Sequence, residues 1–403
     1  MKKIVLSTIA ALAVSATSLS AAQQFYVDDK GQVFTTAAEG RTAINVEEAG
    51  KVLNSAEAPE KKTKNGFFDR FHAKGDLRLR QEVIEKEGSA DKNRERYRFR
   101  YSVNFDATDN IRLETAVSSG KYNPTSGNVS FKSDENIQEY FIDELKIDIL
   151  ALKYSFDNSW VRVGKQAHDI YRPIKTQLVW DNDIRLEGIN YGYKDGNSMI
   201  RVGANRVHRE KDNRDGDDIN IFLAQYVHTQ KLDDAKLNLG AAYYHYDGVE
   251  GTTHPYDSGF MGNTSETVNG VDVYKEDYGI VEAFAEIQVK DLVMGMPAKA
   301  AVILAYNALA SDDNFGYDIS AELAMTKKWK AAVTYRDVQK DAVYGAHNDS
   351  DFSGGGTDSK GYYVKTKYAF AKNVDVAGWW NWSKLGDAEL DFHRVQLDVI
   401  LKF

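Results

Sequence analysis

The chain has 403 residues, with no Cys and only 5 Pro but 23 Tyr and 30 Gly. Without Cys it can form no disulfide framework and perform no thiolate chemistry. Its 60 Asp and Glu outnumber its 51 Lys and Arg, and the formal net charge of −9 argues against nucleic acid as a partner.

The first residues have the pattern of a secretory signal. Two lysines precede an apolar stretch from Ile4 to about Val14, and the small residues Ser-Ala-Ala follow at 20–22. A stretch this short, diluted by Ser and Thr, suits a cleaved signal better than the alternative, a single membrane helix. We predict that residues 1–22 are a signal peptide, whose loss takes the formal charge to about −11.

Residues 23–69 differ in pattern from the rest of the chain. Residues 25–34 resemble a small hairpin about a Lys-Gly turn, and residues 37–56 mix Ala, Glu and aliphatic residues at loose helical spacing. We interpret residues 23–69 as a periplasmic extension, either a free segment or a plug for a channel mouth. A partly disordered linker is the alternative, which the basic run at 61–64 favours.

Residues 94–106 alternate almost without a break. Tyr97, Phe99 and Tyr101 share one parity with Val103 and Phe105, while arginines and small polar residues take the other. Only a strand sorts side chains in this way, because successive residues of an extended chain point to opposite faces. A transmembrane barrel repeats such a pattern on every strand, with an apolar exterior and a polar lumen.

The alternation recurs to the end of the chain in about sixteen segments. They are residues 72–85, 94–107, 111–120, 139–156, 160–166, 183–194, 199–209, 218–230, 235–246, 278–290, 298–309, 316–326, 329–338, 361–370, 374–383 and 392–403. Short gaps between them alternate with longer ones, as turns and loops do at the two rims of an outer-membrane barrel. No other apolar run is long enough for a membrane helix, so a membrane-embedded chain must close its sheet. We predict an all-β fold, a transmembrane antiparallel barrel of about 16 strands over residues 70–403.

Two segments fit this pattern poorly. Ile184 and Leu186 are at even positions, whereas the next apolar residue, Ile189, is at an odd one. This change of face predicts a β-bulge near Gly188. Residues 300–304 are apolar on both faces of the expected strand.

The final segment carries the most specific local pattern. Alternate apolar residues from Val395 to Leu401 lead to the terminal Phe403 on the same face. We expect this strand to pair with the first one, because closure removes both sheet edges. A chain that ends on an aromatic residue in this phase resembles the C-terminal signal read by the barrel assembly machinery.

With these patterns, the sequence resembles the putative outer-membrane porin family of Gram-negative bacteria. The matching segments are residues 74–82, 93–101, 119–126 and 180–188. The resemblance implies a non-enzymatic passive diffusion channel for small hydrophilic solutes, a homotrimer of the bacterial outer membrane that needs no cofactor. Outer-membrane lipid, lipopolysaccharide and the barrel assembly machinery are its expected partners. The N-terminal extension departs from a minimal porin.

Inward-facing basic residues concentrate on the early strands. The predicted pore-lining residues are Arg78, Arg80, Arg96, Arg98, Arg100, Arg112, Arg162 and Arg201. Fixed guanidiniums beside a narrow aqueous path would screen solutes by charge and favour anions. In the alternative interpretation they pair with carboxylates such as Asp76, Glu82 and Glu114 and stiffen the wall.

Residues 166–181 are the candidate constriction loop. The segment is long, carries apolar residues that suit open solvent poorly, and offers Asp169, Arg172, Lys175 and Asp181 as lumen charges. Its position resembles the loop that folds inward in general porins. An extracellular cap that never enters the barrel is the alternative.

Other motifs carry little functional signal. The glycines at 354–356 lack the context of a phosphate loop and indicate a flexible surface loop. The aspartates at 212–218 could hold a divalent ion between lipopolysaccharide molecules, but their spacing favours a solvated turn. We therefore predict no catalytic residues and no metal site. A substrate-specific anion or saccharide channel with a binding track at Trp379, a non-channel structural or adhesive barrel, and an outer-membrane lipase remain the alternatives.

Overall fold

The structure is a computed structural model that describes residues 25–28, 33–34, 36–45, 66–120, 124–131, 145–208, 218–256, 259–293 and 295–403. It divides into two compact units, Met1–Asp69 and Arg70–Phe403. The predicted signal peptide, residues 1–22, and the aspartates at 212–217 lie outside the described residues. Within the described ranges, no helix has the length and apolar character needed to cross a membrane.

The first unit contains a small antiparallel sheet in the order β2-β1-β3, formed by β1 (Phe25–Asp28), β2 (Val33–Phe34) and β3 (Arg41–Ile44). The predicted hairpin is formed by β1 and β2, which pair with Val27 opposite Val33. The helical spacing noted in residues 37–56 does not produce a helix at Arg41–Ile44, which form β3 and pair with all four residues of β1. Thr42 and Ile44 are β-branched residues that suit a sheet, and residues 46–56 lie outside the described part.

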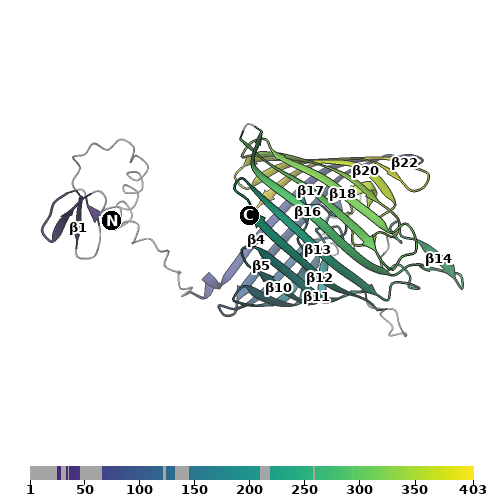
Figure 1. Ribbon diagram of the computed structural model, residues 1–403, viewed down its shortest axis with the longest axis horizontal. Helices are drawn as coiled ribbons and strands as arrows, with labels where there is room; N and C mark the ends of the chain where they lie inside the picture. The colour runs from purple at the N-terminus through teal and green to yellow at the C-terminus, as the bar shows by residue number, and fades with distance from the viewer. Residues whose placement is uncertain are drawn as a thin grey trace. The chain divides into compact units, whose positions relative to one another are not determined.

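The second unit is a closed antiparallel barrel of sixteen long strands in which sequence neighbours pair (Figure 1). The strands are β4 (Phe71–Lys86), β5 (Lys92–Asp106), β6 (Ile111–Ser119), β8 (Leu145–Phe156), β9 (Ser159–Ala167), β10 (Arg185–Lys194), β11 (Ser198–His208), β12 (Ile219–Lys231), β13 (Ala235–Asp247), β16 (Tyr278–Val293), β17 (Met296–Asn307), β18 (Phe315–Ala324), β19 (Trp329–Val338), β20 (Ser359–Ala371), β21 (Val374–Leu385) and β22 (Leu390–Lys402). The two-residue β7 (Val129–Ser130) pairs with β5 beyond the end of β6. The ring closes where β22 pairs with β4, with Val395 opposite Val83. The predicted fold class is confirmed.

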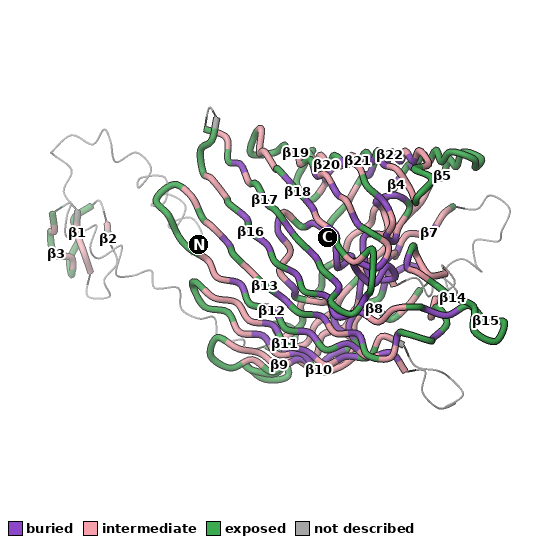
Figure 2. The backbone as a smooth tube through the Cα atoms, turned by 45° about the vertical axis from the view of Figure 1, so that its right-hand side comes forward, coloured by how far each residue is buried: buried purple, intermediate pink, exposed green. Residues whose placement is uncertain are grey.

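Exposure alternates along the strands, as the green and purple of Figure 2 show. On β22, Val395, Leu397 and Val399 are 49%, 56% and 45% exposed, whereas Gln396 and Asp398 between them are buried. The apolar residues therefore face outward and the polar ones face the interior. An apolar outer band with polar residues inside is the arrangement that a lipid environment requires of a barrel.

The two rims of the barrel differ. At one end, here called the short-turn rim, connections such as 107–110, 157–158 and 195–197 join neighbouring strands, and the chain also enters at Phe71 and ends at Phe403. At the other end, the long-loop rim, the connections include the long segments 168–184, 248–277 and 339–358; among the described residues, only the connections 87–91 and 386–389 at this rim are shorter than six residues. The segment 248–277 carries its own hairpin of β14 (Ser265–Val268) and β15 (Val271–Tyr274).

Much of the lumen is occupied by a hydrophobic cluster, here called the inner core. Long-loop residues and inward strand residues form it together; its members include Leu178, Trp180, Tyr244, Tyr246, Tyr274, Tyr278, Ile280, Ile303 and Tyr344. Each of these side chains is 0–1% exposed. Where the loops pack in the inner core, the inner face of the barrel is apolar.

The inner core explains the two segments that broke the alternation. The bulge expected near Gly188 is wrong, because β10 pairs with both neighbours in unbroken register through that residue. Ile184 and Leu186 take the inward parity because they pack in the inner core. Likewise, Ala301 and Ile303 face the inner core while Val302 and Leu304 face outward, so β17 is apolar on both sides.

Candidate pore and vestibule

The loop between β9 and β10, residues 168–184 and here called the constriction loop, lies inside the barrel and crosses its lumen. It contains the predicted segment 166–181 except for residues 166–167, which belong to β9. The loop leaves β9, and its short 3-10 turn η2 (Pro173–Lys175) packs against β16, β17 and β18 on the far side of the ring. The Tyr171 hydroxyl donates to Glu286 Oε2 on β16 at 2.9 Å and accepts from Asn238 Nδ2 on β13 at 2.8 Å. These contacts fix the loop as a crossbar, in contrast to the extracellular cap that was the alternative.

A second segment, residues 339–358, also folds into the lumen, which the sequence reasoning missed. Its backbone meets the constriction loop where Asp181 N donates to His347 O at 2.8 Å and Asp349 N donates to Gln177 O at 3.1 Å. Ser350 then donates from both its backbone N and its Oγ to Asp181 Oδ2, at 3.0 and 3.1 Å. The two segments therefore form one inward assembly.

The glycines at 354–356 belong to this second segment, so the flexible surface loop expected there is wrong. Gly356 and Thr357 are buried, and Thr357 N donates to Met261 O at 2.9 Å. Gly356 has a φ of +92°, and a Cβ there would lie 2.2 Å from Met261 O. Glycine is required because the backbone turns in the left-handed region against another backbone.

Two carboxylates of the constriction loop lie in opposite electrostatic settings. Burial and the neighbouring charges of Asp183 and Asp349 raise the pKa of Asp181 well above its usual range. Burial of most of the Asp183 side chain acts in the same direction, but the Arg100 guanidinium, 2.7 Å away, outweighs that effect and holds the pKa of Asp183 below its usual range. The loop thus presents a firmly ionised carboxylate to the β5 wall.

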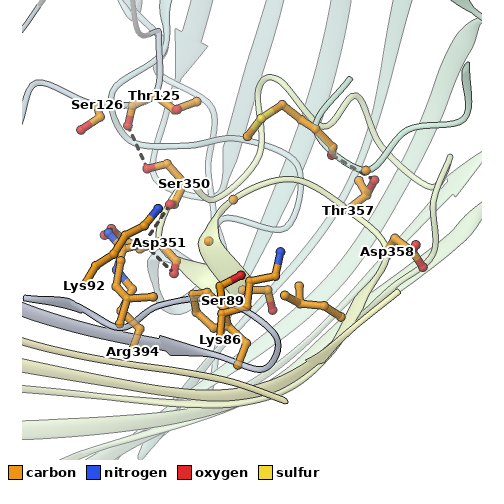
Figure 3. A pocket seen from close by; sticks show the side chains of 18 of the residues that line it. Lys86, Ser89, Lys92, Thr125, Ser126, Ser350, Asp351, Thr357, Asp358 and Arg394 are labelled. Carbon is orange, nitrogen blue, oxygen red and sulfur yellow. Dashed lines mark hydrogen bonds and ion pairs between the residues drawn. The ribbon is translucent and has the colours of Figure 1, made fainter. Parts of the chain in front are cut away.

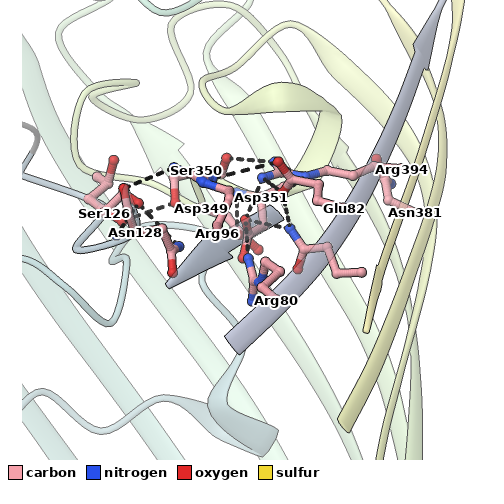
Figure 4. Close-up of polar contacts among 12 residues, drawn as sticks. Arg80, Glu82, Arg96, Ser126, Asn128, Asp349, Ser350, Asp351, Asn381 and Arg394 are labelled. Carbon is pink, nitrogen blue, oxygen red and sulfur yellow. Dashed lines mark hydrogen bonds and ion pairs between the residues drawn. The ribbon is translucent and has the colours of Figure 1, made fainter. Parts of the chain in front are cut away.

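A network of ion pairs, here called the latch, ties residue Asp351 of the second segment to the wall (Figure 4). Asp351 Oδ1 lies 2.9 Å from Arg394 Nη2 on β22 and 3.4 Å from Arg80 Nη1 on β4. Glu82 Oε2 accepts from Arg394 Nε at 2.9 Å, and Gln396 Nε2 donates to both Glu82 and Asp351 at 2.9 Å. Burial opposes ionisation of Asp351, yet Arg394 and Arg80 lower its pKa below the usual range.

The other arginines predicted to line the pore all have acceptors. Arg78 contacts Asn128 Oδ1 and Asp398, and Arg96 donates to Asn128 O and lies 3.6 Å from Glu82. The others form ion pairs: Arg98 with Asp76, Arg112 with Asp106, and Arg162 with Glu114 and Asp169. Arg201 donates to three backbone carbonyls and stacks on Trp160. These contacts are those of the wall-bracing interpretation, and they also hold the guanidiniums in fixed positions beside the lumen.

The four charged residues proposed for the constriction loop have different surroundings. Asp169 pairs with Arg162 at 2.9 Å, and Arg172 donates to the backbone oxygen of Trp180 at 2.8 Å. Asp181 joins the two inward segments, whereas Lys175 is exposed at the tip of η2. Only Lys175 therefore presents its charge to open lumen.

A cavity of about 710 Å³, here called the vestibule, opens between the β4–β5 hairpin and the second inward segment (Figure 3). Lys86, Lys92, Arg94 and Arg96 line one side of it, and Asp351 and Asp358 line the other. Arg394 also lines it, so the latch residues Asp351 and Arg394 both border the vestibule. Cationic residues outnumber carboxylates in this lining.

Trp379, the candidate for a binding track, faces the lumen but is only 8% exposed. It is covered by Tyr363 and by Phe352 of the second inward segment. Lys365 Nζ lies 5.7 Å from its ring centroid and the guanidinium carbon of Arg394 5.8 Å away. The Trp379 indole is thus packed against other aromatic rings, with the Lys365 and Arg394 cations close to it.

The terminal Phe403 seals the seam of the barrel. Its backbone exchanges two hydrogen bonds with Gly75, of 2.7 and 3.1 Å. Its ring stacks near Phe99 and Tyr101 and covers Gly75, where a Cβ would lie 2.4 Å from the ring.

No group of His, Asp and Glu that could hold a metal ion is found in the part of the chain that the structure describes.

Comparison with known proteins identifies the family. The family model described as "Putative porin" matches residues 83–279 and 283–403. Among solved structures, one described by the asymmetric conductivity of engineered proteins is 12% identical with a TM-score of 0.51, and a triple mutant of the Rhodopseudomonas blastica porin is 12% identical with a TM-score of 0.49. OmpT of Vibrio cholerae with loop L8 deleted is 11% identical with a TM-score of 0.47.

Each of these alignments covers 83% of this chain and 100% of the other. At such low identity the likeness at a TM-score of 0.51 shows the fold alone. No curated protein matches the sequence. Because the family model matches most of the chain, the chain belongs to the putative porin family, and it is a transmembrane β-barrel channel of the bacterial outer membrane.

Proposed function

We propose that this channel is a porin that passes small hydrophilic solutes down their gradient and screens them by charge. The observation that carries the proposal is the crossbar of residues 168–184 inside a closed barrel, meeting the arginine wall at the 2.7 Å contact between Asp183 and Arg100. A solute enters the vestibule, passes the latch, and then follows the gap between the crossbar and the inner face of β4–β6. Size is limited by the inward segments and charge by the wall.

Fixed guanidiniums facing carboxylates set up a transverse field across such a gap. Arg cannot lose its charge at any working pH, so the pairs of Arg98 with Asp76 and Arg100 with Asp183 stay polarised. Pairing weakens the field of each guanidinium but leaves a fixed dipole beside the solute path. The excess of cations in the vestibule lining supports a preference for anions.

The same proposal assigns the remaining parts of the chain. Residues 1–22 direct export, residues 23–69 form a periplasmic extension before the barrel of residues 70–403, and the short-turn rim faces the periplasm. The seam contact of Phe403 supports its use as a signal for barrel assembly. We also propose a homotrimer embedded in lipid and lipopolysaccharide, because the family consists of porins.

Single-channel recording of the purified barrel in planar bilayers tests the function. An ohmic current in KCl, with a reversal potential in a salt gradient that indicates anion preference, is the expected result. A folded barrel that gives no current would favour the structural or enzymatic alternatives.

A substrate-specific channel is the second candidate, and the vestibule favours it. A cavity of about 710 Å³ lined by cations and hydroxyl groups is large enough to hold a solute rather than only pass it. Saturable block of the current by one solute would distinguish this candidate from a general porin.

A further inference from the structure

The inner face of β17–β20 near the short-turn rim carries a group of lysines. Lys299 lies on β17, Lys330 on β19 and Lys367 on β20, each in the same parity as buried inward residues of its strand. In the ladder between β19 and β20, Lys330 stands directly opposite Lys367. Like charges in directly opposite positions destabilise a sheet, because such side chains lie about 5 Å apart.

The constriction loop adds a fourth lysine to the same place. Lys175 is the last residue of η2, which packs against β17 and β18, the strands that carry Lys299 and its partner Glu322. Among the described residues, the Lys175 side chain has no ion pair. Burial and the positive charges of Lys330 and Lys367 lower the pKa of Lys175, as expected if these lysines converge.

The carboxylates nearby do not balance these charges. Glu322 is shared by Lys299 at 3.2 Å and Lys330 at 3.1 Å. Asp375 is shared by Lys367 at 2.7 Å and Lys402 at 2.5 Å. A third carboxylate, Glu286, accepts from Ile174 N beside Lys175 at 3.1 Å. Five lysines with three carboxylates still leave an excess of two positive charges, in a chain whose total formal charge is −9.

The lysines remain accessible from the lumen. The side chains of Lys299, Lys330, Lys367 and Lys402 are 36%, 46%, 40% and 51% exposed. A lysine ammonium is a compact charge with three donors on a flexible stem, so several of them can close on one multiply charged group. Walls of low dielectric constant strengthen the attraction of such a group for anions.

We propose that Lys175, Lys299, Lys330 and Lys367, here called the lysine site, bind multivalent oxyanions on the short-turn side of the constriction. The ligand class is solutes that carry phosphate, sulfate or several carboxylate groups. The proposal rests on the proposed function, because a solute that has passed the gap beside β4–β6 enters the part of the lumen that the lysine site faces. An anion bound there relieves the repulsion between Lys330 and Lys367 and gives Lys175 a counter-ion.

Pyrophosphate is the probe for the lysine site. Added to a planar bilayer that carries the barrel in dilute KCl, it should block the current saturably. The variant Lys330→Gln/Lys367→Gln should raise the half-blocking concentration at least about tenfold, since hydrogen bonds to charged groups are lost. Lys175→Gln should also weaken the block, because it removes the loop's own cation.

Lys360→Gln is the matched control. Lys360 lies on β20 like Lys367 but in the opposite parity, and it pairs with Glu389 outside the lysine site. This variant should leave the half-blocking concentration unchanged. Equal block in the Lys330→Gln/Lys367→Gln variant and the wild type would overturn the proposal.

Calorimetric titration of the purified barrel with pyrophosphate separates the site from the pore. A conducting barrel that shows neither block nor binding heat refutes the lysine site and leaves the porin function intact. A silent barrel that binds pyrophosphate through Lys330 and Lys367 supports the site and refutes the pore. Chloride at the same ionic strength should cause no saturable block.

Discussion

The latch at Asp351 gives the sharpest test of how the lumen is built. Asp351 is the residue through which the second inward segment is tied to β4 and β22 by charge, through Arg80 and Arg394. The substitution Asp351→Asn keeps the shape of the side chain and removes that charge. The segment should then leave the wall more often, and the gap beside it should widen.

The size of the effect follows from the contacts. Asp351 makes one close contact of 2.9 Å with Arg394 and one longer contact of 3.4 Å with Arg80, and a hydrogen bond to a charged group contributes about 1.5–3 kcal/mol. Arg394 keeps Glu82 and Arg80 keeps Asp398, so the larger cost of an unpaired buried charge does not arise. We expect a loss of about 2 kcal/mol of anchoring, which increases the released population about thirtyfold.

Two measurements follow this population. Single-channel recordings of Asp351→Asn should show a higher mean conductance and more current noise than the wild type, and limited proteolysis should cut within residues 339–358 faster. Asp358→Asn is the control, because Asp358 lies in the same segment and lines the same vestibule without an arginine in contact among the described residues. Wild-type conductance, noise and protease resistance in Asp351→Asn would show that charge does not hold the segment.

Three further predictions concern the seam, the wall and the inward assembly. Gly75→Ala places a Cβ 2.4 Å from the Phe403 ring, so the barrel should lose about 1–3 kcal/mol of stability. The thermal conversion of refolded barrels on semi-native gels measures this loss, and Phe403→Ala in the same chain should recover part of it. Arg98→Ala/Arg100→Ala should shift the reversal potential toward cation preference; an unchanged potential would leave these arginines as bracing alone. Because the pKa of Asp181 is raised, the folded state takes up a proton that the unfolded chain releases at the same pH, so the folded arrangement around Asp181 is most stable in acid and loses stability as pH rises through that pKa. Asp181→Asn should remove this pH dependence of channel noise, and a persistent dependence would assign it to another group.

The sequence predicts the wall of the barrel well, because each wall residue has only two environments. On β5, the alternation of Arg96, Arg98 and Arg100 with aromatic residues assigns a face to every position without knowledge of any partner. All sixteen predicted strands correspond to strands of the barrel, with ends that differ by a few residues in most cases. Lipid outside and polar groups inside make the period of two the dominant signal.

The interior is much less visible in the sequence, because its contacts join segments far apart in the chain. Nothing local in residues 339–358 predicts that Ser350 will donate to Asp181, or that Asp351 will meet Arg394. The pairing of Lys330 with Lys367 requires the register between β19 and β20, which only the structure supplies. Lys175 was predicted as a lumen charge of the constriction loop, but its place in a group of lysines depends on residues of other strands and could not be predicted from the sequence.

One signal of the filled lumen was nevertheless present in the sequence. A strand between lipid and water alternates, whereas a strand between lipid and packed protein is apolar on both faces. Residues 300–304 have that second character, and the pair Ile184 and Leu186 is apolar on its inward face alone; both border the inner core. Such breaks in alternation therefore mark where loops fold back against the wall. Water and solutes must instead pass along wall that stays polar on the inside, as β4, β5 and β22 do beside the arginines and the latch, and as β17–β20 do at the lysine site.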